Sequence, residues 1–374
     1  MNKVQVPLSG PDITQREIDL VLSVLRSPVL SMGPMVVRFE QAVAAYCGAD
    51  YGIAVSSGTA GLHLTMVAAG IKPGDEVITS PFSFVASANC ILYEGGTPVF
   101  VDIDPQSLNL DPALVECAIT PHTRAILPVH VFGQPADVAP ILDIARRYQL
   151  IVVEDACEAI GAEYRGQQVG TFGQAAVFAF YPNKQITTAE GGMIVTHDAA
   201  WAGLFRSLRN QGRDDNGTWL HHVRLGYNYR LDELSAALGV AQMERIDELI
   251  ARRAQVAAWY NTRLADVPGV RIPAIVPDTT RASWFVYVVR LAPELERDQV
   301  MELLDRFGVP SRPYFVPIHL QPLFRERFGY RPGDFPITEA VARSTLALPF
   351  FSLMGEDQVE YVCHTLKEAI RQIT

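Results

Sequence analysis

The sequence lacks the features of membrane and secreted proteins. No apolar run approaches the roughly 18 residues that cross a bilayer, and the N-terminal stretch MNKVQVPLSGPD has no apolar signal core. The cysteines are odd in number, scattered, and form no CxxC pair, which argues against a zinc site and against a disulfide framework. They are Cys47, Cys90, Cys117, Cys157 and Cys363. We therefore expect a cytoplasmic protein with buried, reduced cysteines and no membrane partner.

An excess of positive charge is also missing. Of the 374 residues, 31 are Lys or Arg and 41 are Asp or Glu, so the formal net charge is −10. This balance argues against a nucleic-acid partner, as does the absence of a helix-turn-helix pattern with a basic recognition helix. No GxGxxG motif opens a helix after the first predicted strand, which disfavours dinucleotide binding. A small anion held in a local pocket stays compatible with the composition.

Short apolar segments alternate with helical patterns over the first half of the chain. The helical patterns occupy residues 58–70, 83–96 and 135–150, with apolar residues three and four apart. The apolar segments are nearly continuous in hydrophobicity, as in strands that are covered by helices on both faces. They predict a mainly parallel, doubly wound α/β sheet, whose ligands lie beyond the carboxyl ends of the strands. The predicted strands are 51–57, 75–81, 97–104, 124–133, 150–157, 175–182 and 191–198.

The pattern changes near residue 230. Residues 231–267 form a long amphipathic stretch without a strand, followed by a strand pattern at 282–291 and helical patterns at 296–308 and 355–373. We predict a large α/β domain over residues 1–245 and a smaller α+β domain over residues 246–374. The polar, Gly-containing loop 210–226 is predicted to be the most mobile segment.

The first candidate site is SSGTAGLH, Ser56 to His63, where a predicted strand gives way to a helix. Gly58 lets the backbone approach an anion closely, and a helix N-terminus offers unpaired N–H groups. The hydroxyls of Ser57 and Thr59 add donors. A helix cap without a ligand is the alternative interpretation, because Ser and Thr are common at helix starts.

Two further candidates end predicted strands. Asp155 closes the apolar segment LIVVED, where a carboxylate is costly unless a cation or hydrogen-bond donors accompany it. It is a helix cap, an ion-pair partner, or the carboxylate that holds a protonated ring nitrogen of a cofactor. Lys184 follows the segment AAVFAFYP. A lysine in a partly dry pocket can act as an amine nucleophile, although any single lysine in a turn is more often simply exposed.

A phosphate cradle, an acid for a pyridinium nitrogen and a lysine for an imine together form the parts of a pyridoxal phosphate site. The chain also resembles the DegT/DnrJ/EryC1/StrS family of sugar-nucleotide aminotransferases, which have the type I fold of aspartate aminotransferase. The matching motifs occur in family order and cover most of residues 5–245, with a weaker match beyond. They are SSGTAGLH, KPGDEVITSPFSFVASAN, GGTPVFVDIDPQSLNLDP, ILPVHVFGQPAD, VVEDACEAIGAEYRGQQVGTFG, FYPNKQITTAEGGMIVT and LGYNYRLDELSAALG.

The resemblance implies a role for each matching residue. Lys184 would form the imine with the cofactor and move the proton between the amino donor's α-carbon and the cofactor. Asp155 would keep the pyridine nitrogen protonated. Gly58 and Thr59, joined by Ser57, would bind the phosphate. Phe84 would stack on the ring, and Glu158 would lie near it. Asn228 would reach the phosphate of the neighbouring subunit, in a homodimer with shared active sites.

Some positions depart from the family pattern or have no assigned role. Ala179 stands where relatives often have a serine whose hydroxyl binds the phosphate, so Ser57 or a water molecule would have to replace that donor. Ala189 stands where many relatives have glycine and carries little weight. Candidates to bind substrate anions are Arg230 and His319, together with Arg213 and Arg312, each of which is equally compatible with a structural ion pair or surface charge.

The resemblance also bears on the reaction. Related sugar 3-dehydratases carry histidine where this chain has Lys184. The lysine therefore favours transamination over dehydration. The motif QITTAEGG resembles the branch that aminates C4 of nucleotide-linked 4-keto-6-deoxy sugars, whereas the C3 branch more often reads LGAxGDGG. We therefore expect ping-pong transfer from glutamate to a keto sugar, in amino sugar biosynthesis of the kind that serves lipopolysaccharide O-antigen. Amination at C3 or of a cyclitol ketone, a dehydratase, and a non-catalytic regulator are the alternatives.

Overall fold

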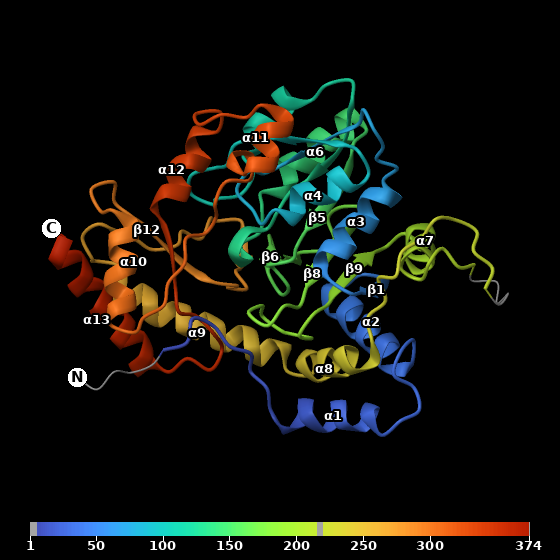
Figure 1. The fold of residues 1–374 in the computed structure, drawn as a ribbon, viewed down its shortest axis with the longest axis horizontal. Coiled ribbons are helices and arrows are strands. Elements are labelled where there is room, and N and C mark those ends of the chain that lie inside the picture. Colours follow the sequence, from blue (N-terminus) through green and yellow to red (C-terminus); the bar gives the residue numbers. More distant parts are fainter. Residues whose placement is uncertain (1–5, 215–219, 374) are drawn as a thin grey trace.

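A computed structural model describes residues 6–214 and 220–373 of the protein (Figure 1). Part of the predicted mobile loop 210–226, residues 215–219, lies outside the described residues. Within the described part of the chain, no helix combines the length and the apolarity needed to cross a membrane.

A seven-stranded sheet forms the centre of the molecule, in the order β1-β9-β8-β5-β4-β2-β3. β9 runs antiparallel to both of its neighbours, and the other pairings are parallel. The predicted doubly wound, mainly parallel fold is confirmed, and each of the seven predicted segments contains one strand. These are β1 (Tyr51–Val55), β2 (Glu76–Thr79), β3 (Thr97–Phe100), β4 (Thr123–Leu127), β5 (Ile151–Asp155), β8 (Ala175–Ala179) and β9 (Gly192–Thr196).

Helices cover both faces of this sheet, and the period-two alternation of the strands explains why. On β8, Val177 packs into an apolar cluster with α3 and α7, whereas the next residue, Phe178, packs into a cluster with α2 and α8. Both side chains are fully buried. The helices of these layers are α2 (Pro34–Cys47), α3 (Gly58–Ala68), α4 (Ala86–Tyr93), α6 (Val138–Tyr148), α7 (Ala199–Arg209) and α8 (Glu233–Met243).

The predicted amphipathic stretch 231–267 is two helices, α8 and α9 (Ile246–Leu264), separated at residues 244–245. α9 is the long helix that connects the large sheet to the C-terminal elements (Figure 1). It contributes Ile250 to an apolar cluster of the large sheet and Tyr260 to the apolar cluster of the C-terminal elements. One helix therefore belongs to both cores. The predicted domain boundary between residues 245 and 246 stays a prediction.

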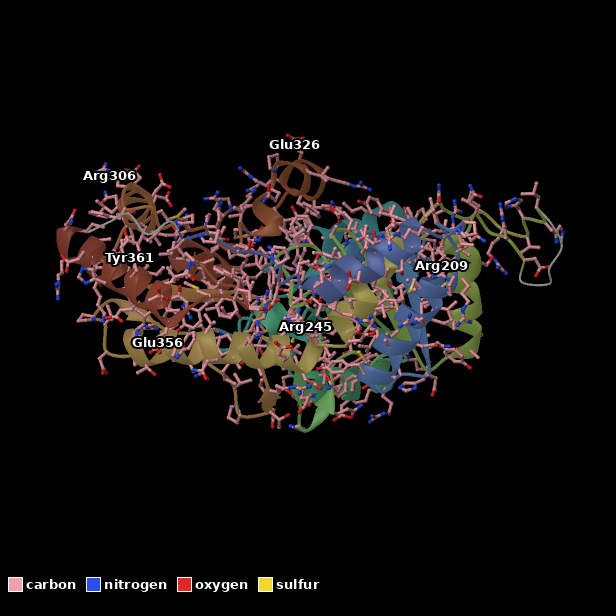
Figure 2. All side chains as sticks on the ribbon, turned by 90° about the horizontal axis from the view of Figure 1, so that it is seen from below. Arg209, Arg245, Arg306, Glu326, Glu356 and Tyr361 are labelled. Atoms are coloured by element: carbon pink, nitrogen blue, oxygen red, sulfur yellow. The ribbon has the colours of Figure 1, made fainter. Side chains whose placement is uncertain are left out.

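A second, three-stranded antiparallel sheet has the order β10-β12-β13. Its strands are β10 (Val270–Arg271), β12 (Tyr287–Leu291) and β13 (Thr345–Leu348), and it packs with α9, α10 (Arg297–Arg306) and α13 (Glu356–Ile373). The view from below shows Arg306, Glu356 and Tyr361 at this end of the molecule and Glu326 on its outer surface (Figure 2).

The remaining elements were not predicted from the sequence pattern. They are α1 (Gln15–Leu25), α5 (Pro112–Val115), α11 (Pro322–Phe328), α12 (Pro336–Ser344), the short 3-10 helices Glu116–Ala118, Val131–Gly133 and Ile318–Leu320, and a small sheet of β6 (Glu163–Tyr164), β7 (Gln167–Gln168) and β11 (Thr279–Arg281).

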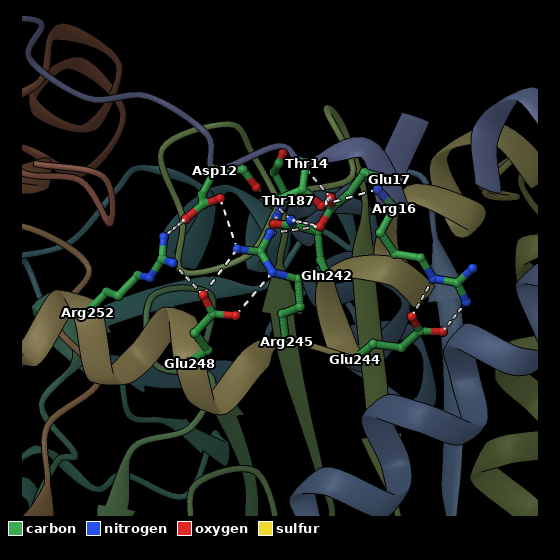
Figure 3. Close-up of polar contacts among 10 residues, drawn as sticks. All are labelled: Asp12, Thr14, Arg16, Glu17, Thr187, Gln242, Glu244, Arg245, Glu248 and Arg252. Atoms are coloured by element: carbon green, nitrogen blue, oxygen red, sulfur yellow. Dashed lines mark hydrogen bonds and ion pairs between the residues drawn. The ribbon is translucent and has the colours of Figure 1, made fainter. Parts of the chain in front are cut away.

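A buried polar network fixes α1 to α8 and α9 (Figure 3). The amide of Gln242 donates to a carboxylate oxygen of Glu17 at 2.8 Å and to the carbonyl of Asp12 at 2.9 Å. Its oxygen accepts from the backbone N–H of Thr187 at 3.2 Å, three residues after Lys184. One amide side chain therefore joins the N-terminal segment, α8 and the loop that follows Lys184.

Glu17 is the charged centre of this network. Its side chain is fully buried and lies 3.1 Å from a guanidinium nitrogen of Arg245. Burial alone would raise the pKa of Glu17, but hydrogen bonds from Thr14 and Gln242 outweigh burial and lower the pKa to about 2. Because the folded-state pKa is lowered, ionised Glu17 stabilises the fold above the ordinary carboxyl pKa, and this contribution is lost as the pH falls toward about 2.

We predict that Glu17→Gln lowers the free energy of unfolding by about 2 kcal/mol at pH 7, because it removes charge-assisted hydrogen bonds. The difference from the parent protein should shrink as the pH falls below the ordinary value of 4.5. Urea unfolding at pH 7 and pH 3 measures both values. Glu248→Gln, which changes a half-exposed partner of Arg245, is the control and should have a smaller effect. An equal loss at both pH values would contradict this account.

Candidate active site

A pocket of about 440 Å³ lies where β5 and β8 end and α3 begins. This is the carboxyl edge of the parallel strands, where ligands of doubly wound sheets bind. It contains the following predicted site residues: Ser57, Gly58, Thr59, Phe84, Asp155, Glu158 and Lys184. Four segments that are distant in the sequence therefore meet in one cavity.

The start of α3 forms one wall of the pocket. Ser57 caps the helix, because its hydroxyl oxygen accepts from the backbone N–H of Ala60 at 3.1 Å. A Cβ atom on Gly58 would come within 2.7 Å of the Cβ atom of Ala179 and 2.8 Å of the sulfur of Cys157. Only glycine fits here, so the helix start lies directly against the end of β8.

Asp155 ends β5 at the base of the pocket and is only 4% exposed. The hydroxyl of Ser87 on α4 donates to its Oδ2 at 2.6 Å, and the backbone N–H of Cys157 donates to Oδ1 at 3.2 Å. A further hydrogen bond of 2.7 Å joins the hydroxyls of Ser83 and Ser87. These donors compensate for the burial of the carboxylate and fix its orientation.

Lys184 and Glu158 face each other across the pocket. The Nζ atom of Lys184 lies 3.5 Å from Oε1 of Glu158 and 3.7 Å from the ring centroid of Phe285. Oε2 of Glu158 accepts from the backbone N–H of Phe132 at 2.9 Å. Burial raises the pKa of Glu158, and the charge of Lys184 opposes that rise. Both side chains are about nine-tenths buried, so the amine lies in a largely dry environment.

Arg253 on α9 fixes the backbone of Lys184. Its guanidinium donates to the carbonyl of Lys184 at 2.7 Å and to that of Asn183 at 3.3 Å. It also donates to the carbonyls of Phe285 at 3.0 Å and Trp284 at 3.2 Å. Arg253 is 1% exposed and has no carboxylate partner among the described residues, and burial lowers its pKa to about 10. It therefore joins the Lys184 turn to the segment that leads into β12.

The other candidates lie outside this pocket. Asn228 is exposed, next to Tyr229, whose carbonyl accepts from the backbone N–H of Ser56. Arg230 donates to the side-chain oxygen of Asn210 at 3.0 Å. His319 is fully buried in the 3-10 helix Ile318–Leu320, with Nε2 3.2 Å from Oε1 of Glu339.

His319 also packs against the rings of Tyr330 and Phe335, so it has the surroundings of a core residue. Burial lowers its pKa. Arg312 is exposed, and Arg213 pairs through its backbone with His222. The described structure brings none of these four charged residues into the pocket lining, and their role in substrate binding stays a prediction.

Several pocket residues were missed by the sequence analysis. Ser83 precedes α4 and Ser87 lies in its first turn, and their spacing of four residues could have indicated a hydroxyl pair. Arg253 falls on the apolar stripe of α9, between Ile250 and Val256, which marks it as a buried charge. Tyr314 and Phe315 had no such signal, because they lie in an irregular segment.

The pocket fits pyridoxal phosphate. The glycine-tight start of α3 offers backbone N–H groups to a phosphate. The hydrogen-bonded carboxylate of Asp155 offers an acceptor to a protonated ring nitrogen. Phe84 lines the pocket and is 61% exposed, so its ring is free to stack on a flat cofactor. This fold and pocket together are those of a pyridoxal phosphate-dependent aminotransferase of the type I fold.

The comparisons with known proteins agree. The sequence profile of the DegT/DnrJ/EryC1/StrS aminotransferase family matches residues 11–367. GDP-perosamine synthase of Caulobacter vibrioides is 42% identical over 369 residues, which are 98% of both chains. The crystal structure of S. venezuelae DesV in complex with a ketimine intermediate superposes with a TM-score of 0.90 at 37% identity, covering 95% of this chain and 94% of that one.

A putative sugar aminotransferase of Streptococcus pneumoniae, solved in its PLP form, superposes with a TM-score of 0.94 at 26% identity, covering 99% of this chain and 100% of that one. The chain belongs to the DegT/DnrJ/EryC1/StrS aminotransferase family. The predicted family, enzyme class, fold and cofactor are thereby confirmed, whereas the roles of the individual site residues stay predictions.

We predict that Arg253→Met lowers the free energy of unfolding by about 2–4 kcal/mol, because it leaves buried carbonyls without donors. It should also weaken cofactor binding, because the Lys184 turn loses its anchor. Urea unfolding and cofactor titration by visible absorbance measure the two effects.

The matched control is Arg252→Met. Arg252 is the preceding residue on α9 and lies half-exposed in ion pairs with Asp12 and Glu248. The control should retain cofactor affinity. If both variants bound the cofactor as tightly as the parent protein, Arg253 would have no part in positioning Lys184.

Proposed function

We propose that the protein moves an amino group from glutamate to C4 of a nucleotide-linked 4-keto-6-deoxy sugar, in two half-reactions with ping-pong kinetics. Membership of a sugar aminotransferase family supports the transfer of an amino group to a sugar. The observation that carries the proposal is the largely buried amine of Lys184, which faces the carboxylate of Glu158 in the pocket. A lysine rather than a histidine at this position favours amino transfer over dehydration.

Each pocket residue receives a role in this proposal. The bound cofactor supplies an electron sink for the carbon that loses its proton. The Nζ atom of Lys184 removes the proton from the α-carbon of glutamate and, in the second half-reaction, returns a proton to the sugar carbon. Asp155, held by Ser87, would accept a hydrogen bond from a protonated ring nitrogen of the cofactor and so favour its protonated form. Glu158, whose Oε1 lies 3.5 Å from Nζ, orients the amine of Lys184 in the pocket.

The sugar and the nucleotide are inferred from the resemblance. The QITTAEGG motif resembles the branch of the family that acts at C4, and the 42% identical relative is named for a GDP-linked sugar. Tyr314 and Phe315 line the pocket together with Phe285. Aromatic side chains offer packing surface to a sugar ring.

We propose further that two copies of the chain share their active sites. Asn228 is exposed rather than directed into its own pocket, as expected of a residue that reaches a neighbouring subunit. Phe84 and Tyr181 at the pocket are large exposed apolar side chains, and so is Leu225, which is 82% exposed. Exposed apolar side chains of this kind are typical of surfaces that a partner covers. Sedimentation equilibrium tests this proposal, and a monomer at micromolar concentration would contradict it.

The reaction class is tested by the absorbance of the purified, cofactor-loaded protein. We predict that glutamate removes the visible band of the lysine-bound cofactor, because the amino group passes to the cofactor and 2-oxoglutarate leaves. Lys184→Ala should lack the parent band and show no such response. A band that forms but does not respond to glutamate would contradict glutamate as the donor. Failure to bind the cofactor after reconstitution would favour the regulator alternative.

A further inference from the structure

A second cavity of about 400 Å³ lies beside the candidate active site and shares no lining residue with it. The alternation of side chains along the approach to β12 separates the two cavities. Phe285 lines the active-site pocket, whereas Trp284, Val286, Val288 and Arg290 line the second cavity. The opposite wall is formed by the turn at residues 105–108 and by residues 131–134 of the large sheet's loops.

Two arginines face each other in this cavity. Arg271 on β10 and Arg290 on β12 are directly opposite in the antiparallel pair, and both line the cavity. Such cross-strand neighbours have Cβ atoms about 4.5–5.5 Å apart, and like charges placed this way repel each other. Two like charges held in this way favour the binding of an anion between the two guanidinium groups.

Neither arginine has a carboxylate partner within the described residues. Arg290 donates to the carbonyl of Pro105 at 2.7 Å, but its Nε atom is buried without a partner. Burial lowers the pKa of Arg290, and the charge of Arg271 lowers it further. Arg271 makes no side-chain hydrogen bond or ion pair with any residue in the described ranges. The lining itself contains two positive charges and no acidic side chain.

The rest of the lining is largely apolar. Leu108, Ile272, Ile275 and Val288 surround the arginine pair, and the indole of Trp284 adds an aromatic surface. A cavity of this size lies within the range of about 300–1,000 Å³ that is typical of small-molecule sites. Guanidinium groups match the geometry of phosphate oxygens, and an aromatic and aliphatic wall suits a flat ring system.

We propose that this cavity binds a phosphorylated small molecule of the nucleoside diphosphate class. The phosphates lie between Arg271 and Arg290, and the base lies against the apolar wall that includes Trp284. The proposal does not depend on the amino-transfer reaction, because it concerns a cavity that is separate from the Lys184 pocket.

Phe132 lies between the second cavity and the active site. Phe132 lines the second cavity, its backbone N–H holds the carboxylate of Glu158, and its ring stacks on that of Phe315 at 5.3 Å. Phe315 lines the active-site pocket. A ligand that contacts Phe132 would therefore touch a residue that holds Glu158 in place.

The test is calorimetric titration of the cofactor-loaded protein with ADP and, separately, with inorganic pyrophosphate. The loaded cofactor occupies the phosphate cradle at α3, so the probe cannot bind there. We expect saturable binding of ADP that weakens about tenfold or more in Arg290→Gln and in Arg271→Gln. Arg271 is exposed, so the Arg271→Gln variant keeps the test valid if Arg290→Gln does not fold.

Arg306→Gln is the charge-matched control, since Arg306 lies on α10 at the surface of the same end of the molecule (Figure 2). It should leave ADP affinity unchanged. Equal ADP affinity in the parent protein and in both cavity variants would overturn the proposal. Pyrophosphate that binds as tightly as ADP, with no loss of ADP affinity in Trp284→Ala, would overturn the assignment of a nucleoside part.

Discussion

The buried guanidinium of Arg253 is the constraint on which the candidate active site depends. One side chain reaches the carbonyls of Lys184 and Asn183 on one segment and those of Trp284 and Phe285 on another. Because its helix, α9, contributes to both apolar cores, Arg253 ties the position of the lysine to the packing of the two sheets. Main-chain carbonyls take the place of a carboxylate partner, so the charge of Arg253 is compensated without a further acidic side chain at the Lys184 turn.

The other polar groups in the pocket are likewise held by partners from distant parts of the chain. Asp155 and Lys184 follow neighbouring strands, β5 and β8, which bring them to one edge of the sheet. Each then receives a partner from elsewhere in the chain: Ser87 of α4 for Asp155 and Glu158 for Lys184. The loop after Lys184 is tied through Gln242 to the N-terminal segment. The candidate site is thus held by polar contacts from α4, from α8 and from the N-terminal segment.

The sequence allowed the central sheet and the core of the site to be predicted for clear reasons. Nearly continuous, Val/Ile-rich apolar segments identify strands that are covered on both faces, and the carboxyl ends of such strands place Asp155 and Lys184 together. Arg253 escaped prediction because its partners are carbonyls, which any residue supplies. The start of α1 was missed although Thr14 and Glu17 form a capping box that the sequence contains.

The surroundings of His319 could not be predicted from the sequence either. A histidine late in the chain was considered for substrate binding, but its place among aromatic rings is set by tertiary packing that the sequence pattern does not reveal. Arg271 and Arg290 were not singled out either, since they are 19 residues apart and become neighbours only through the β10–β12 register. Residues whose role depends on register or long-range packing therefore need the structure.

The most direct test of the proposed function is to follow the nitrogen itself. The protein would be incubated with ¹⁵N-labelled glutamate and a GDP-linked 4-keto-6-deoxy sugar, and the product examined by NMR. The account predicts that the label appears on C4 of the sugar and that 2-oxoglutarate accumulates in equal amount. Absence of label from C4 of this sugar, together with labelling of a 3-keto sugar nucleotide or a cyclitol ketone in a parallel incubation, would contradict it.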